Sequence, residues 1–310
     1  MRIIRHLRDT PSAYHGSVIA LGNFDGMHLG HQTVIRTAID SANQENTMAA
    51  VMTFEPHPVT ILRPDQPPYC IASFRSKIEQ LQHIGIDAVF AIPFTDHFSK
   101  LPAETFIHDI LFDALHVRHI VVGYDFIFGY KRSGNAELLK TAAEKAGILF
   151  TNVPQVTING DICASSNIRR YLKEGNIAAA NKMLGIPYHL SGKVIKGEQR
   201  GRLIGFPTAN LSLHQLMRPA LGVYAAQVMI EGDPILHNAV ANLGKKPTFN
   251  GQNELLEVHL LDHQADLYGK RLTVYFKEYL RAERKFDGLA ALTAQIQQDA
   301  NQARELLRTI

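Results

Sequence analysis

The segment Gly22–His31 combines three glycines with two histidines in ten residues. It follows directly after the apolar run Val18–Leu21, and its glycines let backbone N–H groups approach an anion closely. His28 and His31 are three residues apart, so they lie on one side of a helical turn. Two imidazoles in that position can donate hydrogen bonds to the phosphates of ATP and to the charge that builds up as pyrophosphate leaves. The segment therefore predicts a phosphate-binding turn that transfers a nucleotidyl group.

The residues of this segment also allow two other interpretations. Glycines and histidines in a loop also serve turn geometry and surface solvation, and a glycine-rich turn by itself leaves that reading open. The order of strand, turn and helix around the segment favours phosphate binding. A zinc site is less favoured, because the pair lacks the intervening Glu of the metalloprotease helix and the sequence indicates no third ligand.

A second group of residues that could do chemistry runs from residue 196 to residue 210. It contains Gly201 and Arg202, followed by the Thr208 hydroxyl and the Asn210 amide. This mixture of glycine, basic and hydroxyl groups suggests a second phosphate loop, although it lacks the Gly-Lys-Ser/Thr order of the common P-loop. Composition alone favours an exposed hairpin of mixed charge.

Two acidic residues stand where ligand chemistry is common. Asp125 comes just past an apolar run, the usual place for a ligand group in an open α/β sheet, although an Asp there also stabilises turns. Glu257 alternates with apolar residues and shares a face with Leu255. That pattern predicts either a carboxylate at the mouth of a barrel or a cross-strand ion pair.

The first half of the chain alternates short apolar, β-branched runs with longer segments of helical period. Strands are expected over residues 18–21, 49–54, 88–92 and 119–122, and helices over 73–84, 102–111 and 135–146. Ser73 is the expected N-cap of the first helix and Gly85 its C-cap. This order is typical of βαβ units, so the fold class predicted here is a Rossmann-like parallel α/β domain.

The pattern changes near residue 185, after two short helices expected over 165–184. Strand-like runs at 194–196, 223–230, 239–242, 255–260 and 272–279 follow one another without intervening helices. They predict a small antiparallel β-barrel, and the segment from Gly288 reads as a C-terminal helix. The expected domains are therefore 1–185 and 186–310.

Composition narrows the class of protein. The 310 residues are 45% hydrophobic, and no stretch approaches ~20 consecutive apolar residues, so neither a membrane partner nor an export signal is expected. The net charge is +3 without a long basic run, which argues against a nucleic-acid partner. Cys70 and Cys163 lack metal-finger spacing, so a reducing cytoplasm is favoured over a disulfide framework.

Several segments together resemble one known family. Gly22–His31 resembles the His-x-Gly-His motif of nucleotidyltransferases, in the form used by bacterial bifunctional riboflavin kinase/FAD synthetases. Thr53–Pro58 and Gly123–Gly129 stand in that family's order. Ala164–Arg169 resembles its Ser-Ser-Thr-x-Ile-Arg element, with Ala in the first position and Ser in the third. Gly205–Asn210 resembles the Gly-Phe-Pro-Thr-Ala-Asn element of the riboflavin kinase barrel, and the resemblance covers almost the whole chain.

For the first domain the resemblance implies an FMN adenylyltransferase that makes FAD and pyrophosphate from FMN and ATP. His28 and His31 would be catalytic. Ser165, Ser166 and Arg169 would bind the ATP phosphates, a task that suits hydroxyls and a guanidinium. Without the resemblance the serines read as a helix cap and Arg169 as a solvated side chain. The remaining implied contacts to nucleotide or flavin are Gly22, Phe24, Asp25, Gly30 and Asp125.

For the second domain the resemblance implies a riboflavin kinase that makes FMN and ADP. Thr208 and Asn210 would contact Mg²⁺ and the ATP phosphates, since oxygen ligands suit this ion. Glu257 would be the general base that accepts the proton of riboflavin's 5′-hydroxyl. The other implied cofactor-binding residues are Gly201 and Arg202 in the loop and Arg281 and Glu283 in a flap over the flavin.

Two rival functions were weighed. One is a nucleotidyltransferase for another phosphorylated acceptor, with the barrel only binding it; the presence of Thr208, Asn210 and Glu257 argues against this. The other is a non-catalytic flavin carrier or regulator, which would not need His28, His31 and Arg169. The sequence leaves open whether the chain forms homo-oligomers.

Overall fold

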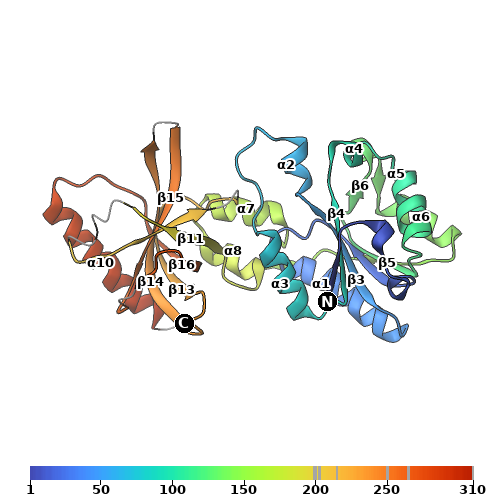
Figure 1. Cartoon of the computed structure of the whole chain (residues 1–310), viewed down its shortest axis with the longest axis horizontal. Helices are drawn as coiled ribbons and strands as arrows, with labels where there is room; N and C mark the ends of the chain where they lie inside the picture. The colour runs from blue at the N-terminus through green and yellow to red at the C-terminus, as the bar shows by residue number, and fades with distance from the viewer. Residues whose placement is uncertain (198–200, 202–203, 214–215, 249–250, 264–265, 309–310) are drawn as a thin grey trace. The chain divides into compact units, whose positions relative to one another are not determined.

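The computed structural model of the chain describes residues 1–197, 201, 204–213, 216–248, 251–263 and 266–308. The chain forms two compact units, Met1–Ser165 and Ser166–Ile310. The first unit is built around a parallel sheet and the second around a closed barrel (Figure 1). Both architectures and the C-terminal helix were predicted from the sequence, and these predictions are confirmed.

The first unit has one sheet of six parallel strands in the order β1-β4-β3-β2-β5-β8. The strands are β1 (Arg2–Ile4), β2 (Val18–Leu21), β3 (Ala49–Glu55), β4 (Ala88–Pro93), β5 (His119–Gly123) and β8 (Leu149–Val153). The four expected strands are β2 to β5, each within one residue of its predicted end. The two edge strands were missed, because β1 has three residues and β8 is buried only at Val153.

Helices cover both faces of this sheet (Figure 1). On one face, α1 (Leu29–Gln44) and α3 (Phe74–Ile84) pack against side chains such as Val18 and Ala20. On the other face, the π-helix η3 (Phe106–Ala114) and α6 (Ala136–Lys145) pack against the alternate residues, including Ile19 and Leu21. Because both faces are buried, the strands read as continuous apolar runs.

The helix ends follow the expected capping chemistry, with two differences. The Ser73 hydroxyl accepts the Ser76 N–H at 3.1 Å, and Gly85 ends α3 in a left-handed conformation at φ 99°. α1 begins at Leu29, one residue before the expected start. The helix expected from Pro102 begins as α5 (Ala103–Thr105) and continues as η3.

Short elements connect these strands and helices in the first unit. They are η1 (Leu7–Asp9), η2 (Ser12–Tyr14), α2 (Pro58–Leu62), α4 (Asp96–Ser99), β6 (Ile127–Phe128), η4 (Tyr130–Arg132), β7 (Gly134–Asn135), β9 (Thr157–Ile158) and β10 (Asp161–Ile162). None was expected from the sequence, since two to five residues carry too little periodicity to be recognised.

The barrel of the second unit is antiparallel and closes in the order β11-β12-β15-β14-β13-β16. Its strands are β11 (His189–Ile195), β12 (Ala209–Leu213), β13 (Gly222–Ile230), β14 (Leu236–Thr248), β15 (Gly251–Leu260) and β16 (Arg271–Arg281). Residues such as Leu211, Leu256 and Val258 are at most 1% exposed. Lys196, expected at the end of a strand, lies beyond β11. The sequence reading missed β12 altogether, because it follows directly on the Gly-Phe-Pro-Thr turn.

The described part of the second unit also contains three helices, the first of which begins at Ser165, the last residue of the first unit. α7 (Ser165–Lys173) and α8 (Ile177–Leu184) are joined at Gly175, as expected, and α10 (Leu289–Leu307) packs Ala300 and Ala303 against Ala225 of the barrel. No helix among the described residues is both long and apolar enough to cross a membrane.

Candidate functional site

The parallel sheet has its switch point beside β2. From β2 the chain adds β3 and β4 on one side and then returns to add β5 on the other. Ligands in such sheets bind outside the carboxyl ends of the strands at this point. The turn Gly22–His31 follows β2 directly, and Tyr124 and Asp125 follow β5. The topology therefore brings the predicted phosphate turn and Asp125 to the same edge of the sheet.

His28 and His31 are held at the start of α1. His28 is the N-cap residue, and its Nδ1 accepts the backbone N–H of His31 at 3.3 Å. The two rings are stacked, with centroids 3.5 Å apart and planes inclined by 21°. His28 is only 5% exposed, and Phe24 stands edge-on to His31 at 5.3 Å. The structure thus brings the two predicted histidines together at a helix N-terminus, where the helix dipole favours an anion.

Asp25 anchors the turn from beneath. It is 3% exposed, and its carboxylate accepts the backbone N–H of Ile71 at 2.9 Å and that of Ala72 at 3.2 Å. Gly22 begins the turn, with its N–H donated to the Met52 carbonyl at 3.2 Å, and Gly30 lies in the first turn of α1. Phe24 is 1% exposed with φ 49°. These four predicted residues shape the turn, and the Asp25 carboxylate binds protein backbone.

Lys77 of α3 is a residue of this site that the sequence reading missed. It is 4% exposed, and its ammonium donates to the Asn23 carbonyl at 2.7 Å and to the Thr53 hydroxyl at 3.1 Å. Burial lowers the pKa of Lys77, while Asp25, Glu55 and Cys70 oppose that shift. The sequence did indicate that Lys77 is buried, because it lies three residues after Phe74 and four before Leu81, on the apolar face of the helix.

Glu55, at the end of β3, shares this charged environment. Burial raises the pKa of its carboxyl, and the charges of Lys77 and Arg5 act in the opposite direction. One buried cation therefore lies close to two carboxylates, those of Asp25 and Glu55, below a turn that is predicted to bind phosphate.

Ser165 connects the start of α7 with the turn. Its hydroxyl donates to the Asp25 carbonyl at 3.1 Å. Arg169 lies four residues further along α7, and the (i, i+4) spacing places it on the same helix face as Ser165. Ser166 is exposed beside Ser165. The predicted phosphate-binding residues of this segment thus occupy the first turns of one helix.

Aromatic side chains gather beyond β5, close in sequence to Asp125. Phe126 and Phe128 stack at 5.4 Å, and Phe128 continues to Phe106 at 5.2 Å. Asp125 itself is exposed, as are Tyr124, Ile127 and Tyr130 in the same segment. An exposed apolar and aromatic edge of this kind could cover a flat ring.

In the second unit, three polar side chains form a row across neighbouring strands. Asn210 of β12 pairs in register with Glu257 of β15, and Glu257 pairs with Asn242 of β14. Residues directly opposite each other share a face of the sheet. This face is the outer one, since Leu256 and Val258 fill the barrel interior. Glu257 is half-buried between the two amides, on the face opposite to Leu256 and Val258.

The amide oxygen of Asn210 is a buried acceptor. Asn210 is 6% exposed, and its Oδ1 is buried without a hydrogen-bond partner among the described residues. Thr208 is exposed two residues earlier, and the carbonyl of Gly201 accepts the N–H of Phe206 at 2.8 Å. A buried amide oxygen followed by a hydroxyl is a donor set that fits Mg²⁺. Arg202 lies outside the described residues.

Arg281 and Glu283, the predicted flap residues, make contacts within the second unit. The Arg281 guanidinium donates to both carboxylate oxygens of Asp299 in α10, with the shortest contact at 2.7 Å. Asp299 is 2% exposed and also accepts the Gln295 amide at 2.8 Å. The Glu283 carboxylate lies so close to Gly244 that a Cβ there would stand 2.2 Å from its Oε1. Arg281 therefore fastens the end of β16 to the C-terminal helix.

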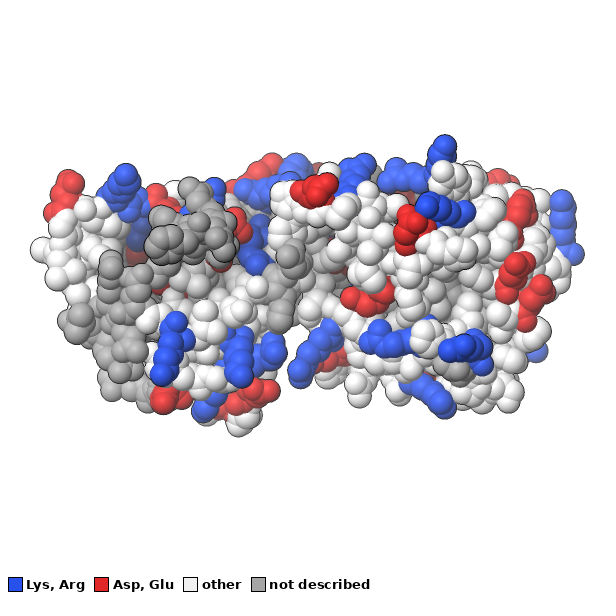
Figure 2. Space-filling model, turned by 45° about the horizontal axis from the view of Figure 1, so that its top comes forward, with Lys and Arg blue, Asp and Glu red and all other residues white. Residues whose placement is uncertain are grey.

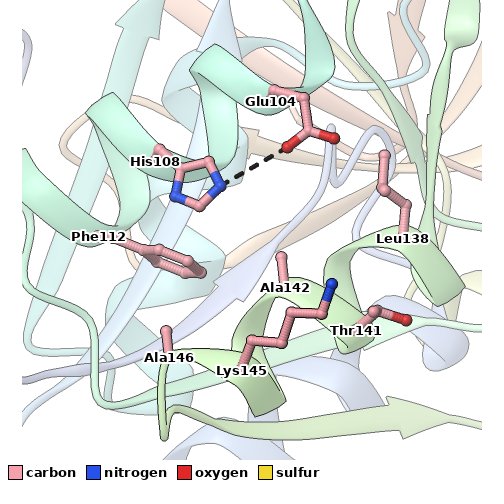
Figure 3. Close-up of a pocket in the computed structure, with 8 residues that line it drawn as sticks. All are labelled: Glu104, His108, Phe112, Leu138, Thr141, Ala142, Lys145 and Ala146. Carbon is pink, nitrogen blue, oxygen red and sulfur yellow. Dashed lines mark ion pairs between the residues drawn. The ribbon is translucent and has the colours of Figure 1, made fainter.

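A separate pocket of about 270 Å³ lies between η3 and α6 (Figure 3). Glu104 and His108 pair on one side at 3.6 Å, and Lys145 stands on the other. None of its lining residues belongs to the predicted sites. On the face shown in Figure 2, basic and acidic side chains are interspersed over both units.

Comparison with known proteins agrees with both halves of the chain. Residues 10–167 match the family model for FAD synthetase, and residues 184–307 match that for riboflavin kinase. A Haemophilus influenzae protein named bifunctional riboflavin kinase/FMN adenylyltransferase is 38% identical over 304 residues, which cover 98% of both chains. A Bacillus subtilis protein of the same name is 39% identical over 293 residues, covering 93% of this chain and 91% of that one.

One solved structure has the same fold over almost the whole chain. It is a crystal structure described as a macrolide-efflux protein from Streptococcus pneumoniae, with a TM-score of 0.87 and 33% identity. The match covers 97% of this chain and 98% of that one.

Proposed function

The chain belongs to the family of bifunctional riboflavin kinase/FMN adenylyltransferases, and from that premise we propose which residues carry its two reactions. The enzyme phosphorylates riboflavin with ATP to give FMN and adenylylates FMN with a second ATP to give FAD. We assign FAD formation to residues 1–185 and FMN formation to residues 186–310.

In FAD formation, an oxygen of the FMN phosphate attacks the α-phosphorus of ATP, and the bond to the β-phosphate oxygen breaks to release pyrophosphate. The observation that supports the assignment is the stacked pair His28 and His31 at the start of α1. Their imidazoles donate hydrogen bonds to the phosphates and stabilise the charge that moves onto pyrophosphate. Gly22, Phe24, Asp25 and Gly30 form the turn that holds them.

The groups around the turn orient the two substrates. Ser165, Ser166 and Arg169 bind ATP phosphate oxygens from the first turns of α7, because hydroxyls and a guanidinium supply several donors there. The aromatic segment that begins at Tyr124 covers the flavin ring, and Asp125 lies beside it. Positioning and charge stabilisation supply most of the rate, so no covalent enzyme intermediate is needed.

In FMN formation, Glu257 accepts the proton of the ribityl 5′-hydroxyl as that oxygen attacks the γ-phosphorus of ATP and ADP leaves. The row Asn210, Glu257 and Asn242 supports this assignment, because it presents a carboxylate between two amides on one face. Gly201 and Arg202 contribute to the loop around the ATP phosphates. Arg281 and Glu283 position the flap over the flavin.

Thr208 and Asn210 would hold Mg²⁺ through their oxygen atoms. When bound, the ion neutralises phosphate charge and orients the triphosphate. The buried Asn210 Oδ1 supports this role. We further propose that the enzyme works in the cytoplasm, where thiols such as those of Cys70 and Cys163 stay reduced.

The metal assignment is tested by titrating Mg²⁺ while FMN and FAD are followed by chromatography. Asn210→Ala is expected to raise the Mg²⁺ concentration for half-maximal FMN formation by about tenfold or more. FAD formation from supplied FMN keeps its wild-type Mg²⁺ dependence. Asn301→Ala, on the exposed face of α10, is the matched control. An unchanged Mg²⁺ dependence of FMN formation in Asn210→Ala would remove Asn210 from the metal site.

A further inference from the structure

Cys163 lies directly against the N-cap of α1. It follows β10 and is 4% exposed, and its N–H donates to the Val156 carbonyl at 2.8 Å. Its Sγ is 3.6 Å from Nδ1 of His28. Gly30 permits this close approach, because a Cβ at that position would lie 3.1 Å from the Cys163 carbonyl oxygen and 3.2 Å from the His28 ring. None of the predicted roles or comparisons assigns this thiol a function.

The contacts of His28 fix where its proton sits. A backbone N–H can only donate, so the contact from the His31 N–H at 3.3 Å makes Nδ1 of His28 an acceptor. In a neutral imidazole the proton is then on Nε2. The thiol stands at the same Nδ1, where its S–H and the His31 N–H share the one lone pair of this nitrogen in a three-centre hydrogen bond.

The groups around Cys163 keep its thiol protonated, so that it can donate a hydrogen bond. Burial raises the pKa of Cys163, although the backbone N–H groups of Gly30 and Leu29 hydrogen-bond to the sulfur and oppose that shift. These N–H groups belong to the first turn of α1, which has no intrahelical acceptor for them. With its lone pairs engaged by backbone donors, a protonated sulfur directs its hydrogen elsewhere, and His28 Nδ1 is within reach.

We propose that Cys163 is a positioning residue for FAD formation: its thiol donates to Nδ1 of His28 and, with the His31 N–H, holds the imidazole as the Nε2–H form that donates to phosphate. This inference rests on the proposed role of His28. A residue that only fills space at this position needs no hydrogen-bond donor. The positioning role, in contrast, requires the S–H group of Cys163.

Three variants test the donor, with FAD formation from supplied FMN as the readout. Cys163→Val keeps approximate size without a donor, Cys163→Ala removes both, and Cys163→Ser keeps a hydroxyl donor. We expect kcat to fall about fivefold in the Val and Ala variants, with the KM values for ATP and FMN little changed, and to stay near the wild-type value in the Ser variant. FMN formation and thermal unfolding serve as controls for folding.

Nitrogen-15 NMR of histidine-labelled protein reads the tautomer without relying on activity. In the wild type, His28 should show an unprotonated Nδ1 and a protonated Nε2, and Cys163→Val should increase the share of the Nδ1-protonated form. Full activity in Cys163→Val, equal loss in the Ser and Ala variants, or a protonated Nδ1 in the wild type would each overturn the proposal.

His28→Ala separates this inference from the function beneath it. If His28→Ala loses FAD formation while every Cys163 variant keeps it, only the positioning role fails. If His28→Ala keeps full FAD formation, the proposed role of His28 fails and the positioning role fails with it.

Discussion

The two candidate sites are built from different parts of the protein chain. In the first unit, the reacting groups sit on a turn and a helix start, with Asp25 and Lys77 buried beneath them. In the barrel, Asn210, Glu257 and Asn242 stand on three neighbouring strands whose ladder fixes their spacing. A turn has no ladder of hydrogen bonds between strands, so its shape depends on the side chains buried beneath it. We therefore expect the first site to be sensitive to changes beneath it and the second to changes in the row itself.

The largest effect is expected for Glu257→Gln. The amide keeps the size of the side chain but cannot accept the proton of the 5′-hydroxyl, so the kcat for FMN formation should fall about 10³-fold. FAD formation from supplied FMN should stay at the wild-type rate. Glu278→Gln, an exposed position on β16, is the control. Comparable FMN formation by Glu257→Gln and Glu278→Gln would show that the row does not contain the general base.

The second largest effect is expected for Lys77→Met, because the Lys77 side chain is buried and hydrogen-bonds to the turn. In Lys77→Met the Asn23 carbonyl and the Thr53 hydroxyl lose a buried donor, so the free energy of unfolding of the first unit should fall by about 1–3 kcal/mol. FAD formation should decline as well, while FMN formation is kept. Hydrogen-exchange mass spectrometry in urea can follow peptides from 18–93, with barrel peptides from 222–281 as the internal reference.

Lys140→Met is the matched control for that prediction, because Lys140 is half exposed on α6 and pairs with Glu144 at 3.9 Å. If Lys77→Met exchanges no faster than Lys140→Met over residues 18–93, the turn does not depend on the buried ammonium. Faster exchange in the barrel peptides would also contradict the contrast between the two sites.

The smallest effect is expected for Glu55→Gln, and it depends on pH. Burial raises the pKa of Glu55, so its contribution to folding is fully present below the unfolded pKa and is lost as pH rises through the folded one. The amide avoids that loss. The variant should therefore be more stable than the wild type near neutral pH, and the gain should vanish near about pH 4.

Circular dichroism melts at several pH values can measure this difference. Glu79→Gln is the control, since Glu79 is an exposed residue of α3 that pairs with Arg75 at 2.8 Å. A Glu55→Gln gain that is constant with pH would mean that ionisation of Glu55 is not its cause.

The sequence predicted the first site better than the second. Glycine spacing after a continuous apolar strand was enough to locate the turn and both histidines, because the strand and the helix start are local features. The helical spacing of Lys77 indicated burial but not its partners, because Lys77 lies 46 residues after His31 in the chain, and Cys163 likewise lies 135 residues after His28. Only the fold brings such residues to the turn.

In the barrel, strand pairing over long stretches of sequence limited what could be predicted. The runs around Val223 and Leu272 were recognised as strands, but β12 was hidden behind Gly205 and Pro207, which are typical of turns. Without β12, Asn210 has no partner strand, so its register with Glu257 could not be foreseen. The position of Glu257 between the two amides likewise depends on which strands pair, which is a long-range property.

The most direct test of two independent sites in this chain is the product pattern of His31→Ala. The purified variant is incubated with riboflavin, ATP and Mg²⁺, and FMN and FAD are separated by chromatography. The two-site account predicts that FMN accumulates at the wild-type rate while FAD formation falls at least about 10²-fold, because His31 acts only on the phosphates of the second ATP. Wild-type FAD formation by His31→Ala, or loss of both products in a folded variant, would contradict it.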